Sequence, residues 1–471
     1  MTRPKSVSTL KVIIAIILIN VFDCVDCILN NQDTLDITND RNFNCHWTGG
    51  SDPKLTCDCL TDKEEFVIKH NSIPVYDVAM IKITNCGKIT IGANAFAEMR
   101  SLRSITLENI KSIVLEADSI SWLGSVRNRE NLIDWDPSVP SIRVYLISSN
   151  IDLIANNAIH GRINLLEIIN CDIQHMSSFA VSRLQQMLNI RITGSTFHQL
   201  ETQSFKRFTT ENLLITNTAF ATIPSRAFYE LTVRDQFLLD NITVYDTLKP
   251  SGFTITNPYN FQMLNSHINA IAGSGFKVAT RGPVVIQNNR FHNTANSAFR
   301  SISLNKEDPN EYETIKFERN IFDQLSKDAL VVDKDSFRPV FVNLQLTEKC
   351  ECGNLERYFR HDENTLELSC MSERDSDEWV SVDHFQSTRC GMLDTKSGTA
   401  YIIAGVCAIV VVIVGSIVGF YFIRLHRSKS YDKNSTDKNG KVSMIVPDGR
   451  TYRETELCVI VERADLLTTD L

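Results

Sequence analysis

Short apolar runs rich in Ile, Val, Leu and Phe recur through the middle of this 471-residue chain at a nearly constant spacing. Most steps between successive runs are about 22 to 25 residues long. The runs begin at Ile81, Ile105, Val144, Leu166, Ile190, Leu213, Phe237, Phe261, Val284 and Ile315. One short strand cannot bury its apolar face alone, whereas stacked turns pair their strands in parallel and share one continuous core. The spacing therefore predicts a parallel β-solenoid with about ten repeats.

The residues inside each repeat resemble the template of the leucine-rich repeat, L-x-x-L-x-L-x-x-N/C-x-L followed by a buried Phe. The N/C position is occupied by Cys86, Cys171, Asn289 and Asn320. An Asn at this turn can bond the backbone of neighbouring turns. The resemblance covers roughly Cys45 to Cys390, and it implies a curved horseshoe whose concave side is lined by the strands.

A competing fold is the right-handed parallel β-helix, which shares the period and also favours Asn at its turns. The repeats Val284–Leu304 and Ile315–Val332 resemble its coils, and folds of this kind include polysaccharide lyases. The cysteines favour the leucine-rich repeat, because they resemble the caps that flank such arrays. We therefore expect a leucine-rich-repeat horseshoe with disulfide caps and keep the right-handed parallel β-helix as the alternative.

Two cysteine clusters lie at the two ends of the repeats, and we expect them to form disulfides outside the cell, where such bonds persist. They are Cys45, Cys57, Cys59, Cys86, Cys350, Cys352, Cys370 and Cys390. The family resemblance implies the pairs Cys350–Cys370 and Cys352–Cys390, and it leaves the pairing of the N-terminal cluster open. Thr347-Glu-Lys stands where the C-terminal flank of the family usually has Asn-Pro-Trp.

The two termini predict a membrane topology. A basic start followed by the apolar stretch Val12–Phe22 is typical of a secretory signal peptide. The uncharged run Ala400–Ile423 is long enough to span a bilayer, and the cations from Arg424 to Lys433 place the C-terminus in the cytoplasm. The predicted parts are a signal peptide (1–27), an N-terminal cysteine cap with the first strand (28–86), a leucine-rich-repeat-like array (81–346), a C-terminal cysteine cap and stalk (347–399), a transmembrane helix (400–423) and a disordered cytoplasmic tail (424–471).

The sequence predicts a binding protein and no enzyme. No carboxylate pair recurs at matching positions of neighbouring runs, and the ten histidines show no metal-ligand spacing. No long basic run indicates nucleic-acid binding. We therefore expect no catalytic residue, metal or cofactor. The favoured function is a type I plasma-membrane receptor or adhesion protein with an extracellular protein ligand. The alternatives are an accessory or cargo receptor and a membrane-tethered carbohydrate-active β-helix enzyme.

Two sets of outward-facing residues are candidates for recognition. A mixed aromatic, aliphatic and charged patch is the predicted ligand site: Tyr145, Ile147, Glu167, Ile169, Arg191 and Leu214. An asparagine-rich column runs beside it: Asn85, Asn109, Ser148, Asn170, Gly194, Asn217, Asn241, Asn265, Asn288 and Arg319. This column is either a polar recognition face or a structural amide ladder, and we favour the ladder. Asn241-Ile-Thr is a glycosylation sequon.

The tail contains two short motifs for cytoplasmic partners. Glu462 with Leu466 and Leu467 resembles the acidic dileucine signal that clathrin adaptors bind, which implies endosomal cycling. The last residues Thr469, Asp470 and Leu471 resemble a ligand of PDZ scaffold proteins. Gly415 and Gly419 in the span form a G-x-x-x-G motif that would allow a homodimer.

Overall fold

The structure is a computed structural model of the chain. It describes two compact units, a strand-rich unit in the part of the chain up to Asp394 and a helical unit in the part from Thr395. The described residues are 43–60, 65–70, 72–73, 77–97, 99–122, 140–306, 312–326, 328–352, 366–372, 379–390 and 396–430. The predicted signal peptide and the dileucine and PDZ motifs lie outside these ranges.

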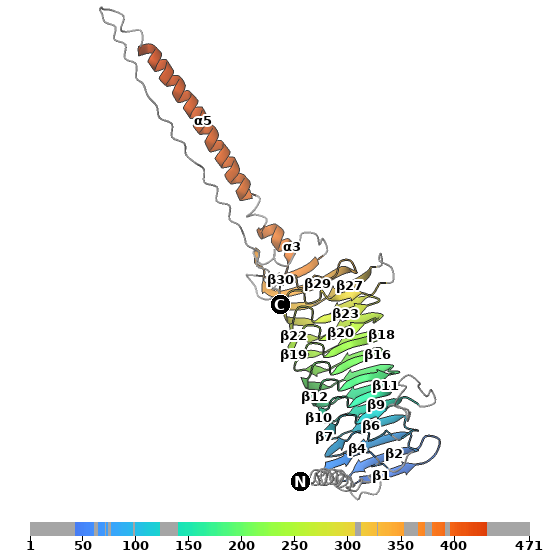
Figure 1. Cartoon of the computed structure of the whole chain (residues 1–471). Coiled ribbons are helices and arrows are strands. Elements are labelled where there is room, and N and C mark those ends of the chain that lie inside the picture. Colours follow the sequence, from blue (N-terminus) through green and yellow to red (C-terminus); the bar gives the residue numbers. More distant parts are fainter. Residues whose placement is uncertain are drawn as a thin grey trace, which may run out of the picture. The chain divides into compact units, whose positions relative to one another are not determined.

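The strand-rich unit is a parallel β-solenoid of about 11 turns, and most turns contribute one strand to each of three sheets (Figure 1). Sheet 1 contains β2 (Lys54–Cys59), β4 (Met80–Thr84), β6 (Ser104–Glu108), β9 (Ile142–Ile147), β14 (Asn189–Thr193), β21 (Asn260–Leu264), β24 (Val284–Gln287), β27 (Glu313–Glu318) and β29 (Phe337–Lys349). Its remaining members are the second halves of β11 (Ile159–Ile169), β16 (Phe205–Thr216) and β18 (Phe228–Asp240).

Sheets 2 and 3 complete each turn. Sheet 2 contains β3 (Glu65–Ile68), β5 (Lys88–Ile91), β7 (Ser112–Leu115), β10 (Asn150–Ile154), β12 (Asp172–Met176), β15 (Thr196–Leu200), β17 (Ala219–Phe220), β19 (Thr243–Leu248), β22 (His267–Ile271), β25 (Arg290–Thr294) and β28 (Ile321–Leu325). Sheet 3 contains β8 (Ile120–Trp122), β13 (Val181–Gln185), β20 (Phe253–Thr256), β23 (Phe276–Thr280), β26 (Ile302–Leu304) and the first halves of β11, β16 and β18.

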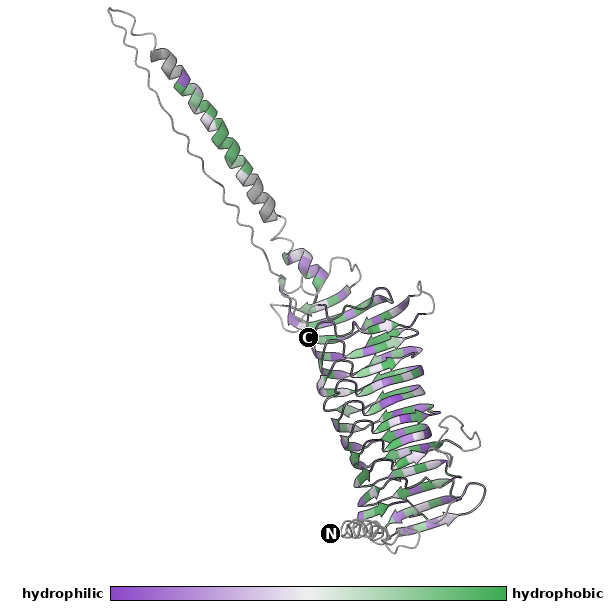
Figure 2. Ribbon diagram, viewed as in Figure 1, coloured by the Kyte–Doolittle hydropathy of each residue, from purple (hydrophilic) through white to green (hydrophobic). Residues whose placement is uncertain are grey.

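The strand register predicted from the repeat is confirmed. Ile81 pairs with Ile105, Ile105 pairs with Val144, and the series continues to Val284 and Ile315. Hydrophobic and hydrophilic residues alternate along the strands (Figure 2). The apolar positions point inward and form one continuous core.

The predicted leucine-rich-repeat horseshoe is wrong. A horseshoe needs strands on one side of each turn and wider elements on the other side, since only then does the stack curve around the strands. Here three sides of the turn are strands in parallel ladders, and adjacent strands are spaced about 4.8 Å apart in any such ladder. No side is wider than the others, so the array has no concave strand-lined face and corresponds to the β-helix alternative.

Residues with left-handed backbone form the corner between sheets 1 and 2. The asparagine-rich column occupies this corner, from Asn85 at φ 59° to Arg319 at φ 52°. Asn tolerates this conformation better than most residues. The side-chain amides also bond along the stack, as where Asn109 Nδ2 donates to Asn85 Oδ1 at 2.6 Å and Asn241 Nδ2 donates to Asn217 Oδ1 at 2.7 Å. The column is therefore a structural amide ladder, which was the favoured interpretation.

The next residue in each turn points into the core and is often polar. Asn320 Oδ1 accepts from the Asn289 backbone N–H at 3.0 Å, and Asn320 Nδ2 donates to the Ile286 carbonyl at 2.7 Å. In the middle of the solenoid a hydroxyl accepts the equivalent backbone hydrogen bond, since Ser195 Oγ accepts from the Cys171 N–H at 3.1 Å. The expected bonding of the template Asn to neighbouring turns is confirmed.

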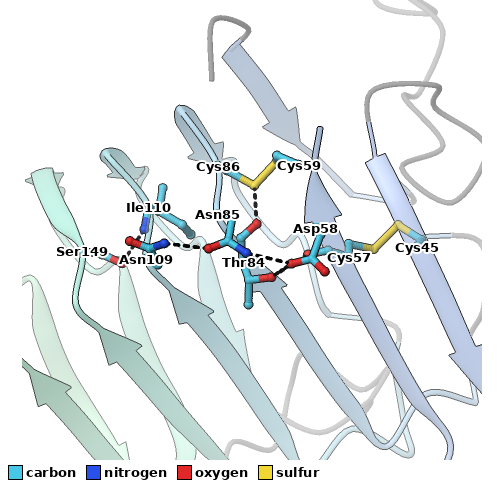
Figure 3. The surroundings of a disulfide bond; sticks show 10 residues. All are labelled: Cys45, Cys57, Asp58, Cys59, Thr84, Asn85, Cys86, Asn109, Ile110 and Ser149. Atoms are coloured by element: carbon cyan, nitrogen blue, oxygen red, sulfur yellow. Dashed lines mark hydrogen bonds between the residues drawn. A yellow bond between two sulfur atoms is a disulfide. The ribbon is translucent and has the colours of Figure 1, made fainter. Parts of the chain in front are cut away.

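Disulfides close both ends of the solenoid. At the N-terminal end the antiparallel strand β1 (Phe43–Thr48) covers β2, and the bonds are Cys45–Cys57 and Cys59–Cys86 (Figure 3). At the other end, β30 (Leu366–Met371), β31 (Trp379–Ser381), α3 (Val382–Phe385) and η1 (Gln386–Cys390) follow β29. There the bonds are Cys350–Cys370 and Cys352–Cys390, the pairing that the resemblance implied.

The helical unit is α5 (Lys396–Ser430). Its segment Gly405–Arg424 is long and apolar enough to cross a membrane. Together with the disulfides, this helix indicates a secreted or membrane-anchored protein.

Candidate functional site

The strands of three successive turns of sheet 3 contain one extra residue at the same place, so the register shifts between β11 and β13 and again between β18 and β20. His160 pairs with Ser182 and Gly161 pairs with Leu184, so Arg183 between them is an extra residue. Arg207 and Glu230 occupy the equivalent place in the next two turns. All three are left-handed, at φ 48°, 48° and 53°. A bulge re-aims its side chain, and non-glycine residues in this conformation are concentrated at functional sites.

A pocket of about 290 Å³ lies beside these bulges. Its lining residues come from three turns and are Asn157, Phe179, Ser182, Arg183, Lys206 and Arg207. Asn157 and Phe179 are left-handed corner residues between sheets 2 and 3. Ser182 and Lys206 are register neighbours on β13 and β16, where both point outward from the core.

The charges of the pocket are mainly positive. Lys206 Nζ lies 4.1 Å from the centroid of the Phe179 ring, which is a cation–π contact. Arg207 Nη2 lies 2.7 Å from Glu230 Oε2. Arg183 is exposed, and it forms no hydrogen bond or ion pair with the residues that the structure describes. One guanidinium and one ammonium are therefore left without a carboxylate partner inside the described part of the pocket.

Neutral polar groups complete the lining. Ser182 Oγ donates to Asn157 Oδ1 at 2.9 Å, and Asn157 Nδ2 donates one hydrogen to Asn156 Oδ1 at 2.5 Å, which leaves the second amide hydrogen for a ligand. Glu230 lies beyond the lining, and hydrogen bonds from Tyr229 and Arg207 lower the pKa of its carboxyl. None of the six lining residues is a carboxylate, so the pocket has the chemistry of an anion-binding site and lacks a pair of acids for glycoside hydrolysis.

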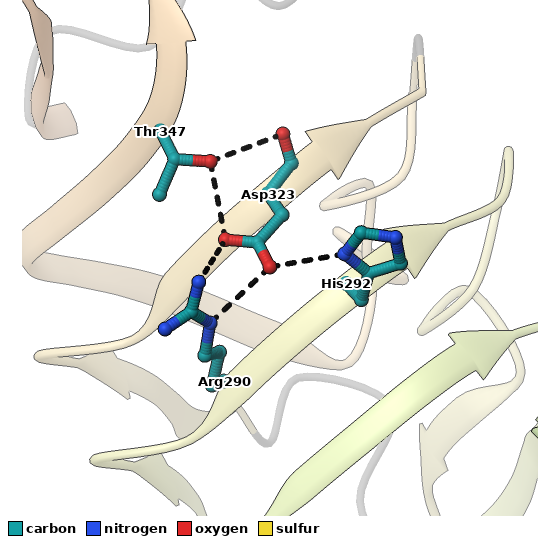
Figure 4. Close-up of polar contacts among 4 residues, drawn as sticks. All are labelled: Arg290, His292, Asp323 and Thr347. Atoms are coloured by element: carbon teal, nitrogen blue, oxygen red, sulfur yellow. Dashed lines mark hydrogen bonds and ion pairs between the residues drawn. The ribbon is translucent and has the colours of Figure 1, made fainter. Parts of the chain in front are cut away.

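A second polar cluster lies near the C-terminal cap (Figure 4). Arg290 donates to both oxygens of Asp323, His292 Nδ1 lies 3.1 Å from Asp323 Oδ2, and Thr347 Oγ1 donates to Asp323 Oδ1 at 3.1 Å. Burial raises the pKa of Asp323, but the hydrogen bonds from these three residues outweigh it and the pKa is lowered. Because every partner belongs to the cluster itself, we assign it a structural role that joins β25, β28 and β29.

The predicted ligand patch forms two neighbouring rows on the outside of sheet 1. Tyr145, Glu167, Arg191 and Leu214 are register neighbours in one row, and Ile147 and Ile169 are neighbours in the other. Arg191 Nη1 also lies 3.2 Å from Glu167 Oε1. The residues are together as expected, but on a sheet of a three-sided coil and not on a concave surface.

The predicted glycosylation site and the repeat residue Cys171 also have clear surroundings. Asn241 is exposed on the corner ladder, where an attached glycan would meet solvent. Cys171 is buried, and burial raises the pKa of its thiol to about 11. A thiol with that pKa is a poor nucleophile, so Cys171 is a core residue. Among the described residues, no group of three or more His, Cys, Asp or Glu side chains could hold a metal ion.

The basic pocket was missed by the sequence analysis, although a signal was present. In Val181-Ser-Arg-Leu and Phe205-Lys-Arg-Phe the inward apolar residues are three apart where a regular strand would space them two apart. That irregular step marks the bulge, and it recurs at the repeat period.

Comparison with known families supports the β-helix architecture. Residues 159–307 match the model of the right-handed beta helix region. This stretch runs from β11 to β26 and includes the left-handed residues Arg183, Arg207 and Glu230. The match overturns the assignment to leucine-rich-repeat membrane proteins, and over this stretch the chain is similar to right-handed coils. No curated protein matches the chain.

Proposed function

We propose that this chain is a membrane-anchored extracellular β-helix protein that binds an anionic carbohydrate in the basic pocket of sheet 3. Right-handed β-helix domains are often carbohydrate-active, which supports the class of ligand. The observation on which the proposal rests is the pocket, where bulges in successive turns present Arg183 and Arg207 beside Lys206.

The lining residues suit an acidic sugar chemically. An arginine fork matches the geometry of a carboxylate or sulfate, and lysine adds a point charge. Asn157 and Ser182 offer hydrogen bonds to hydroxyl groups, and the Phe179 ring adds apolar surface. Small-molecule sites commonly combine such apolar surface with a few placed polar groups. We propose that the pocket binds this ligand. Because its lining contains no carboxylate, a hydrolysis that uses a pair of acids is not part of the proposal.

The proposed location is the plasma membrane, with the β-helix outside the cell. The span Gly405–Arg424 is the anchor, and the disulfides require an oxidising compartment. In this type I orientation the tail motifs at Leu466 and Leu471 are available to clathrin adaptors and PDZ scaffolds. Gly415 and Gly419 lie in the span, where their small size would let two copies of the helix pack closely in a homodimer.

A protein ligand on sheet 1 is the second candidate function. Tyr145 and Arg191 are of the residue types enriched at interface centres, and the neighbouring rows include half-buried aliphatic side chains. The support for this candidate is that all six patch residues lie in two adjacent rows on one outer face of sheet 1. Replacing Tyr145 by Ala should then weaken a protein ligand and leave carbohydrate binding unchanged.

The test of the main proposal is binding of the full-length chain to three polymers, a polyuronate, a sulfated polysaccharide and an uncharged glucan. We expect retention on an acidic polymer, weakening with salt because exposed charges are screened. Arg183→Ala should weaken binding about tenfold, since a hydrogen bond to a charged group contributes about 1.5 kcal/mol.

Arg234→Ala is the matched control, because Arg234 is also exposed but lies outside the pocket and pairs with Glu211 at 3.1 Å. Binding that is equal for acidic and uncharged polymers, or equally weakened by both variants, would contradict the proposed site.

A further inference from the structure

Tyr245 is the most exposed large apolar side chain of the described β-solenoid, at 65%. It lies on β19, where Val244 pairs with Ile268 and Thr247 pairs with Ala270. Tyr245 and Asp246 therefore oppose the single residue Asn269, which is a β-bulge. As at the basic pocket, the bulge turns a side chain outward from an otherwise regular sheet.

Small residues lie on the neighbouring strands next to the residues that follow Tyr245. Ala221 accepts the Asp246 backbone N–H at 2.8 Å in the preceding turn, and Ala270 is the register neighbour of Thr247 in the following turn. Asp246 is held in place, because Thr222 Oγ1 donates to its Oδ2 at 3.0 Å and Thr247 Oγ1 donates to its Oδ1 at 3.2 Å. The result is an open aromatic shelf with a fixed carboxylate at its rim.

The sequon Asn241-Ile-Thr leads into the same strand, with Asn241 at the corner and Thr243 as the first residue of β19. Asn241 is exposed and left-handed at φ 51°, and its Nδ2 donates one hydrogen to Asn217 Oδ1 at 2.7 Å. The amide is thus held in one orientation with its second hydrogen free. Glycosylation replaces that hydrogen: Nδ2 bonds to C1 of a lipid-linked oligosaccharide, the pyrophosphate leaves, and the amide proton is lost.

We propose that the shelf around Tyr245 is the docking surface of the chain's own N-linked glycan on Asn241. Tyr245 is four residues after Asn241, so their Cα atoms are at most about 14 Å apart even for an extended chain. Sugars beyond the first can therefore reach the shelf. A pyranose ring has an apolar face for the Tyr245 ring and hydroxyls for Asp246 and Asn269, and the ring on a rigid strand loses little freedom on binding.

The experiment uses full-length chain in native membranes from cells that add N-linked glycans. An endoglycosidase is added without denaturant, and release is followed by the gel shift. We expect Tyr245→Ala to speed release several-fold, because the glycan is no longer held against the protein. Tyr245→Phe keeps the ring and should release at the original rate. Tyr259→Ala is the matched control, since Tyr259 is 60% exposed but lies away from the sequon.

A second measurement separates glycan docking from a general effect on folding. Tyr245→Ala should lower the midpoint of thermal unfolding in the glycosylated chain and leave it unchanged in the Asn241→Gln chain. Equal shifts in the two backgrounds, equal release rates for the Tyr245→Ala and Tyr259→Ala chains, or mass spectra showing Asn241 unmodified would each overturn the proposal. None of these outcomes depends on the basic pocket, so the proposed function is tested independently.

Discussion

The two halves of the solenoid use one coil geometry with different cores. In the N-terminal half most inward positions of sheet 3 are aliphatic, as at Ile159 and Val181, and Trp122 is an aromatic exception. In the C-terminal half phenylalanines stack in register, as where the Phe205 and Phe228 rings lie 4.6 Å apart and the Phe228 and Phe253 rings lie 4.7 Å apart. The strand spacing of a β-ladder matches the preferred separation of offset rings. The coil therefore requires an apolar side chain at each inward position, spaced by one strand separation. Aliphatic residues and phenylalanines both meet this requirement.

The largest expected effect tests whether the stacked half is the more sensitive one. Phe228→Ala removes a ring that contacts neighbours in both adjacent turns, and it should destabilise the protein by about 4 kcal/mol. Ile159→Ala, at an equivalent position of the aliphatic half, should cost about 3 kcal/mol. Thermal and denaturant unfolding followed by circular dichroism would measure both. A larger loss for Ile159→Ala would contradict the idea that ring stacking adds stability.

A smaller effect is expected from the caps at the two ends. Cys352→Ser opens the Cys352–Cys390 bond, which closes 38 residues, and should cost about 3 kcal/mol. Cys59→Ser opens a 27-residue separation and should cost slightly less, because the entropy of loop closure grows slowly with length. Surface delivery of each variant, measured by antibody labelling, is the readout. Normal delivery of the Cys352→Ser chain would contradict the expected contribution of the Cys352–Cys390 bond to the cap.

The inward-pointing polar residues that follow the corner, such as Ser195 and Asn320, should show a still smaller difference in stability cost between the two halves. Asn320→Ala leaves the Asn289 N–H and the Ile286 carbonyl without partners inside the core, which should cost about 2 kcal/mol. Ser195→Ala removes one acceptor, for the Cys171 N–H, and should cost about 1 kcal/mol. The measurement is the shift in unfolding midpoint. Equal costs would indicate that the amide and the hydroxyl are interchangeable at this position.

The smallest expected effect is a difference in pH dependence. Burial lowers the pKa of His160, so the unfolded chain binds the proton more readily and stability falls as pH drops below about 6.5. The pKa of Asp323 is lowered by its partners, so its contribution is lost only as pH falls below about 3.9. His160→Gln should therefore flatten the mildly acidic part of the stability curve. Asp323→Asn should leave that part unchanged, and the reverse pattern would contradict these assignments.

The sequence by itself determined the strand register of the solenoid and the position of the candidate membrane-spanning segment. Apolar residues such as Ile190, Leu213 and Phe237 must face inward in every turn, so their spacing alone aligns the strands. The apolar run that includes Gly405–Arg424 is likewise a local property of the chain. The corner ladder was also predictable, because Asn is favoured where the backbone is left-handed.

Only the tertiary structure decided between a horseshoe and a β-helix. Both folds repeat at a similar period, and the choice depends on whether the segments after each sheet 1 strand also pair with their counterparts one turn away. Those segments, such as Asp172–Met176 and Val181–Gln185, are only five residues long, and their recurrence at the repeat period fits either fold. The pocket depended on structure for the same reason. Asn157, Arg183 and Arg207 are separated by about one turn each, and they meet because parallel pairing and the bulges bring their side chains to one place on sheet 3.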